Sequence, residues 1–253
     1  MQLNRKPLPP LLQLLDLCCI ELSNWRWSWQ AIALTATISP VLSIIALGTF
    51  APNGDREAKS AILIGSLVMS LMFGNLGNLS SRFAYMRFSG VLDFYMTLPV
   101  RRSLLILAVV LAFFLLSFPA LLVTLLFGSW FLQLPLTLHW LLWLAIPLCV
   151  VPLAGVGAAI GIKAPNPEVT GAVTLLVTML ALFIGPVLLP ASRLPRIVQF
   201  LGDFSPATHA ATVLRQTLLE PPTSSFFLSC GVLLGFSLLT FWLVSRSLQP
   251  KGN

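Results

Sequence analysis

The chain has 253 residues, of which 57% are hydrophobic and only 9% are charged, and its mean hydropathy is +0.91. Because a soluble domain carries about 25% charged residues, this composition excludes a water-soluble globular protein and predicts an integral membrane protein. Fifteen Lys and Arg residues against eight Asp and Glu residues give a net charge of +7. The basic residues stand in short segments between apolar runs, which indicates membrane topology rather than nucleic-acid binding.

The first 28 residues (1–28) are predicted to form a cytoplasmic tail and an amphipathic helix in the membrane interface. On a helical wheel, one arc is polar and holds Gln13, Asp16, Glu21, Ser23 and Asn24. The opposite arc is apolar and holds Leu11, Leu14, Leu15, Cys18 and Leu22. Leu17 and Ile20 break this pattern. A loosely ordered tail is the alternative.

Six apolar runs are long enough to cross a bilayer, since a spanning helix needs about 20 mostly apolar residues. They lie near residues 29–50, 61–80, 103–128, 138–162, 170–190 and 226–245. With the N-terminus inside, ten Lys and Arg residues fall on the inner side and five on the outer side. The positive-inside rule therefore places both termini in the cytoplasm. The predicted fold class is all-α, with one six-span transmembrane domain over residues 29–253.

Polar and small residues inside these runs predict helix packing. Asn75 and Asn78 are expected to bond to a neighbouring helix, or alternatively to line a path. The pairs Gly157/Gly161 and Gly231/Gly235 have the GxxxG spacing that allows helices to approach closely. Packing within the chain is preferred over a dimer seam for both pairs.

The inner connection, residues 81–102, mixes aromatic side chains with arginines. A short helix carrying Phe88, Leu92, Phe94 and Tyr95 would pack against a protein surface, and Arg87 with Asp93 would provide orientation. A positively charged loop whose aromatics lie at the headgroup level is an equally weighted alternative.

The outer connection, residues 191–225, is too apolar for a solvated loop. Its first part has the i, i+3, i+4, i+7 spacing of an amphipathic helix, in Leu194, Ile197, Val198 and Leu201. Ser205 is placed to cap a second helix that begins at Pro206. The two helices would dip into the outer leaflet and narrow an exit, or simply lie on the membrane.

Catalytic and metal-binding patterns are absent from the sequence. It contains neither HExxH nor GxSxG, and its two histidines, His139 and His209, have no obvious acidic or cysteine partner. No ionisable residue stands near the centre of a predicted span, which counts against a proton- or ion-coupled carrier. We therefore expect no catalytic residue, cofactor or metal in this chain.

The two connections together resemble those of a known family. The inner one carries Arg87, Gly90, Leu92, Asp93, Thr97 and the run Leu98-Pro99-Val100-Arg101. The outer one carries Leu194-Pro195, Ser205-Pro206-Ala207-Thr208 and Leu214-Arg215. In order and placement these motifs are similar to those of the ABC-2 type exporters, whose membrane subunits have six spans and an N-terminal interfacial helix.

The resemblance implies a permease subunit of an ATP-driven exporter that works by alternating access, with no ATPase activity of its own. Coupling to the ATPase subunit is expected at Arg87, Gly90, Asp93, Phe94, Tyr95, Pro99 and Arg101. Outer gate helices are expected around Leu194, Pro195, Pro206 and Arg215.

The expected partners are an ABC-type ATPase subunit that holds ATP and Mg, a second permease subunit (a homodimer or a homologous half), and the lipid bilayer, without nucleic acid. The expected location is a bacterial inner membrane. The charge-poor spans favour a hydrophobic or amphipathic cargo. The alternative function is an ATP-independent membrane protein, either a secondary carrier or an assembly factor.

Overall fold

The computed structural model describes residues 9–24, 29–52, 55–98, 102–137, 139–188 and 194–247. Within these ranges every regular element is a helix, which confirms the all-α prediction. The elements are α1 (Pro10–Asn24), α2 (Trp29–Ala33), η2 (Leu34–Ile38), α3 (Ser39–Phe50), α4 (Arg56–Leu71), η3 (Met72–Gly77), α5 (Asn78–Phe88), α6 (Val91–Thr97), α7 (Arg102–Leu132), α8 (Leu142–Lys163), α9 (Pro167–Phe183), α10 (Arg196–Gly202), α11 (Pro206–Leu218) and α12 (Ser224–Ser247).

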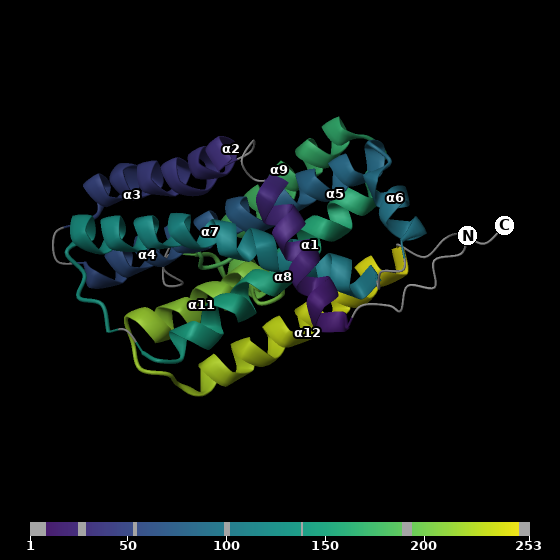
Figure 1. Cartoon of the computed structure of the whole chain (residues 1–253). Coiled ribbons are helices and arrows are strands. Elements are labelled where there is room, and N and C mark those ends of the chain that lie inside the picture. Colours follow the sequence, from purple (N-terminus) through teal and green to yellow (C-terminus); the bar gives the residue numbers. More distant parts are fainter. Residues whose placement is uncertain are drawn as a thin grey trace, which may run out of the picture.

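Four helical stretches in the described residues are long and apolar enough to cross a membrane. They are Arg56–Phe88, Ser103–Leu132, Leu142–Lys163 and Ser224–Ser247. Two shorter apolar helices, Leu34–Phe50 and Pro167–Phe183, coincide with the first and fifth predicted runs. In Figure 1, α3, α4, α7 and α12 run in one general direction, and α1 crosses α7, against which it packs.

The fifth predicted run is too long at its C-terminal end. Helix α9 stops at Phe183, and Gly185 then adopts a left-handed φ of 122°. Gly185 lies so close to Thr208 and Gly202 that a side chain at this position would collide with them. Beyond this turn Val187 is fully buried, and its carbonyl faces Gly65 of α4. Residues 184–188 therefore pack into the helix bundle instead of continuing the span.

The second predicted run is part of a continuous stretch from Arg56 to Phe88 that contains the π-helical segment η3. Within η3, Asn75 donates from Nδ2 to Ser117 Oγ on α7 at 3.0 Å, as predicted for a bond to a neighbouring helix. Asn78 instead donates to the Phe73 and Gly74 carbonyls of its own helix, so that part of the prediction was wrong. A π segment rearranges the carbonyls of its turn, and the Asn78 amide satisfies two of them.

The glycine pair on α8 packs within the chain, as expected. A side chain on Gly157 would collide with the Leu76 backbone, and one on Gly161 with the Ser80 carbonyl. The α8 backbone therefore lies directly against η3 and α5. The pair on α12 differs, since a Cβ added to Gly231 or Gly235 would meet no atom of the described residues within 4 Å. The expected packing of Gly231 and Gly235 within the chain is therefore wrong.

Candidate functional site

The inner connection folds as two helices joined by a sharp turn. Helix α5 continues to Phe88, and Ser89 N donates to the Tyr85 carbonyl at 2.9 Å to end it. Gly90 then takes a left-handed φ of 74°, a conformation that costs glycine little, and α6 begins at Val91. The expected loop beginning at residue 81 is therefore wrong, because α5 buries Phe83, Ala84 and Met86 and stays helical through this segment.

Exposed aromatic and acidic side chains gather around this turn. We call the exposed side chains of Tyr85, Phe88, Asp93, Phe94 and Leu98 the α5–α6 tip. Phe94 is 62% exposed, whereas Leu92 of the same helix is buried. The expected single helix carrying Phe88 together with Phe94 is wrong, since Gly90 breaks it between them. Pro99 and Arg101, which were also expected to contribute, lie outside the described residues.

Arg87 is directed away from the tip and toward α8. Its Nη1 donates to the carbonyls of Ile162 and Ala164, at 2.5 and 2.8 Å. These carbonyls stand at the C-terminal end of α8, where backbone acceptors lack helical partners and favour a cation. Arg87 therefore fixes the end of α5 to the end of α8, and its expected contact with an ATPase subunit stays a prediction.

An ion pair ties α1 to the same region. Arg82 Nε donates to Glu21 Oε2, and Arg82 Nη2 donates to Glu21 Oε1, both at 2.9 Å. The Glu21 side chain is 2% exposed and that of Arg82 is 15% exposed. Nearby on α6, burial raises the pKa of the Tyr95 phenol, the Glu21 carboxylate raises it further, and Arg82 opposes this effect. The ion pair therefore reaches all three helices α1, α5 and α6.

The face of α1 that packs against the protein includes Glu21, which belongs to the predicted polar arc. Leu17 and Glu21 are its buried residues, and α1 packs against α7 through this side. Leu11 and Leu15 of the predicted apolar arc, which was expected to lie in the membrane interface, are exposed on the surface of the protein. The helical wheel assigned Glu21 to the polar face, because an unpaired acidic side chain avoids burial. In the structure Arg82 pairs with the Glu21 carboxylate and compensates its charge. The exposed leucines are left to face the surroundings of the protein.

The second outer helix, α11, is part of the bundle. Almost all its side chains are buried, and it packs against α4, α8 and α12. His209 contacts Ser229 Oγ of α12 through Nδ1 at 3.2 Å and the Asp203 carbonyl through Nε2 at 2.8 Å. A helix merely lying on the membrane is therefore excluded for α11.

The start of α11 was predicted only in part. Ser205 occupies the position before the helix and Pro206 is its first residue, as expected. The Ser205 hydroxyl, however, makes no capping hydrogen bond and is buried without a partner among the described residues. The expected side-chain cap is therefore wrong.

The first outer helix, α10, exposes much of its apolar surface. It follows Pro195, and the Gln199 side chain donates to the Leu194 carbonyl at 2.9 Å. Ile197 is 75% exposed, and Phe200 and Phe204 are exposed beside it and stack edge to face at 5.4 Å between ring centroids. The predicted apolar spacing is present, but its Ile197 and Leu201 do not pack into this chain.

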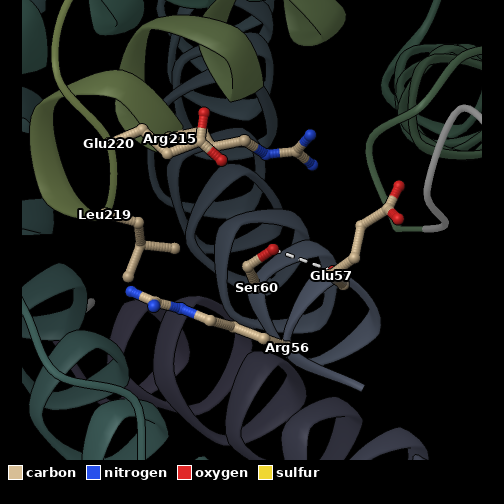
Figure 2. A pocket seen from close by; sticks show the side chains of 6 residues that line it. All are labelled: Arg56, Glu57, Ser60, Arg215, Leu219 and Glu220. Atoms are coloured by element: carbon tan, nitrogen blue, oxygen red, sulfur yellow. Dashed lines mark hydrogen bonds between the residues drawn. The ribbon is translucent and has the colours of Figure 1, made fainter.

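Two hollows lie beside α11. The first is apolar, has a volume of about 470 Å³, and is walled by α4, α7, α8 and α11 through residues such as Leu67, Leu125, Trp143 and Leu214. The second has a volume of about 420 Å³, and two arginines and two glutamates line it where α4 begins and α11 ends (Figure 2). From the sequence, Arg56 serves only to assign membrane topology. The residues on the other side of this hollow come from a segment far along the chain, which the sequence alone does not bring near Arg56.

The described residues hold no group of three or more His, Cys, Asp or Glu side chains that could bind a metal ion. An all-helical bundle with several membrane-length helices and small residues at its helix contacts defines a multi-pass membrane protein.

The sequence comparison gives the family. A sequence model of the family described as "ABC-2 type transporter" matches residues 13–219, and the chain belongs to this family. It is therefore a membrane-embedded permease component of the ABC-2 type and not itself the ATPase. No curated protein matches the chain in sequence.

Proposed function

We propose that the chain is the permease subunit of an ATP-driven exporter in a bacterial inner membrane. The six apolar runs cross the membrane with both termini inside, and a second permease subunit completes the pathway. An ABC-type ATPase subunit, which binds ATP and Mg, docks on the α5–α6 tip. The observation that carries this proposal is the exposure of Phe94 and Asp93 on the short helix α6, which directly follows α5, a helix anchored on two sides.

The anchors suit a helix that transmits force. Arg87 fixes the end of α5 to α8, and the Glu21–Arg82 pair fixes α5 to α1. Because α4, η3 and α5 form one continuous stretch, a displacement at the tip moves the whole second span. The π segment η3 lies in the middle of this stretch, and π segments inside α-helices frequently occur at functional sites. A hydrophobic or amphipathic cargo agrees with the apolar hollow beside α11.

The proposal is tested by charge reversal at the tip. We expect Asp93→Arg to reduce the ATPase subunit that co-purifies with the tagged chain by about tenfold or more, since an interface anchor is worth about 2 kcal/mol or more. Glu168→Arg is the matched control, because Glu168 is an exposed acid in the first turn of α9. Size-exclusion chromatography of the extracted variants checks that the bundle remains folded.

Two results would contradict this function. Equal co-purification by Asp93→Arg and the wild type would exclude the tip as the docking site. Failure of the wild-type chain to bring down any subunit with a GxxxxGK[ST] motif, together with no ATP hydrolysis after reconstitution in liposomes, would favour an ATP-independent membrane protein.

A further inference from the structure

The apolar hollow beside α11 has a volume of about 470 Å³ and is walled by α4, α7 and α8 as well. Its floor consists of buried side chains, among them Leu67 of α4 and Leu214 of α11. Other lining residues are exposed, namely Leu122 and Leu126 of α7 and Trp143 of α8. The hollow therefore opens between α7 and α8, toward the surroundings of the bundle.

Along α7 the hollow extends through one half of the membrane. Its lining residues on this helix run from Phe118 to Leu126, which is about 12 Å along the helix axis. Phe118 stands at the middle of the membrane-length stretch Ser103–Leu132, and Leu126 stands in the half that leads to its end. Half of the hydrocarbon core of a bilayer is about 15 Å thick. The hollow thus has the length and the depth of a single leaflet.

Tryptophans line the hollow at its end nearest to the membrane surface. Trp140 and Trp143 stand where α8 begins, and they are 74% and 78% exposed. Exposed indole rings gather at the headgroup level of a membrane. His139 also lines this end, and its Nδ1 accepts a hydrogen bond from the Leu141 N–H at 3.3 Å. The polar atoms of the lining side chains therefore lie at the headgroup end of the hollow.

Hydrocarbon fills such a hollow better than water does. Water in a cavity needs several polar partners, and every lining residue from Phe118 to Leu126 is Phe or Leu. An empty hollow would deprive these side chains of the dispersion contacts that a neighbouring group provides. The group that surrounds membrane helices at this depth is the aliphatic chain of a lipid. A chain whose headgroup lies beside the tryptophans reaches the level of Phe118 at the middle of the membrane.

We propose that this hollow binds one acyl chain of a phospholipid, which enters between α7 and α8. Its headgroup lies beside Trp140 and Trp143, and its terminal methyl group lies beside Phe118. The lipid comes from the outer leaflet in the orientation given under the proposed function. Binding needs neither the ATPase subunit nor transport, so a failure of this proposal leaves the proposed function untouched.

The test is photo-cross-linking of the detergent-purified full-length chain to phosphatidylcholine that carries a diazirine at the end of one acyl chain. Loosely bound lipid is washed away before irradiation, and peptide mass spectrometry locates the label. We expect the label on α7 near Phe118 to exceed that on Leu228, Leu234 and Leu238, which are exposed on α12 outside this hollow. A diazirine beside the glycerol should label the start of α8 instead. Equal labelling of α7 and α12 by both probes would overturn the proposal, because lipid would then only surround the bundle.

A substitution on α7 tests whether the hollow itself holds the chain. Leu122→Trp places an indole in the path of the acyl chain and should lower the label near Phe118 by about tenfold, since overpacking is costly. Leu115→Trp is the matched control. It makes the same change two turns earlier on the same face of α7, at an exposed leucine that does not line the hollow, and should keep the label. Unchanged labelling in Leu122→Trp, or equal loss in both variants, would contradict the proposal.

The headgroup of the lipid provides a further arm. No Asp, Glu, Lys or Arg is among the described residues that line the hollow. Phosphatidylcholine and phosphatidylglycerol with the same diazirine-bearing chain should therefore label α7 near Phe118 equally. A strong preference for one of these two lipids would show that the headgroup is recognised instead of the chain, and the proposal would be wrong.

Discussion

Glu21 is a carboxylate almost fully withdrawn from solvent, and a single arginine compensates it. Removing Arg82 leaves this buried charge unpaired, which costs about 3–5 kcal/mol in comparable pairs. We therefore expect Arg82→Met to lower the melting temperature of the detergent-purified chain and to expose α1 to limited proteolysis. The measurement is thermal unfolding of the wild type, both single variants and the double variant.

The double variant decides whether the charge is responsible. Glu21→Leu combined with Arg82→Met removes both charges and should recover much of the loss, since an apolar replacement of a buried pair is often neutral. If the destabilisation of the double variant equals the sum of the destabilisations of Arg82→Met and Glu21→Leu, the two residues stabilise the fold independently and the ion pair contributes no coupling energy.

Cys18 and Cys19 are neighbours with different surroundings. Cys18 is half-buried, its Sγ donates to the Ala108 carbonyl of α7 at 3.5 Å, and burial raises the pKa of its thiol. Cys19 is exposed. Because only the thiolate reacts, we expect maleimide at about pH 8, near the ordinary thiol pKa, to modify Cys19 well before Cys18. Peptide mass spectrometry of a labelling time course measures this order.

The serine variants of these cysteines provide the control. In Cys19→Ser only Cys18 remains in α1, and labelling of this helix should be slow. In Cys18→Ser only Cys19 remains, and labelling should be rapid. The labelling rate of Cys18 should keep rising as the pH passes the ordinary thiol pKa, because the pKa of the Cys18 thiol is raised above that value. Equal rates at both positions would mean that α1 does not pack on α7 through this face.

At the scale of elements, the close contact of α8 with η3 and α5 requires glycine, which has no side chain, at the contact positions of α8. A methyl group on Gly157 would overlap the Leu76 backbone, which cannot move aside like a flexible side chain. We expect Gly157→Ala to destabilise the chain by about 1–3 kcal/mol, as overpacking does. Thermal unfolding in detergent measures the change.

Gly231→Ala is the matched control for this prediction. It makes the same change in α12, where no atom of the described residues lies within 4 Å of the new methyl group. Alanine favours a helix more than glycine does, so this variant should be neutral or slightly stabilised. Equal destabilisation by both changes would indicate that the close contact of α8 with η3 does not determine the effect.

The helix boundaries at the inner connection show where sequence patterns lose information. Residues 81–88 carry two arginines directly after an apolar run, which resembles a loop when charge alone is considered. Phe83, Ala84 and Met86 nevertheless bury themselves, and Arg87 satisfies carbonyls of α8. A single sequence does not reveal such tertiary partners, because they come from a segment 75 residues away. The predicted helix also ran through Gly90, although glycine favours the left-handed turn at which the helix breaks.

Across the whole molecule, the least apolar of the four membrane-length helices is the one that is most buried. The stretch Arg56–Phe88 has the lowest hydropathy of the four membrane-length helices and is the most buried, at 83%. The most apolar stretch, Ser103–Leu132, is 50% buried, and α12 is only 22% buried. A membrane protein has no need to hide apolar surface from lipid, so its interior can hold the polar and small residues. Ser70, Asn75 and Ser80 are buried in this central stretch.

Composition and periodicity by themselves determined the membrane class, the helical fold and the approximate positions of the apolar helices, and the motifs of the two connections indicated the family. These properties depend on how apolar a run of side chains is, or on a short motif. Each run or motif can therefore be recognised without knowing what it contacts in the fold. The tertiary structure decided the packed face of α1, the burial of α11, the turn at Gly185 and the orientation of Arg87. Each of these features depends on a partner distant in the chain. The charge, carbonyl group or backbone of that partner decides whether a side chain can be buried and in which direction it points.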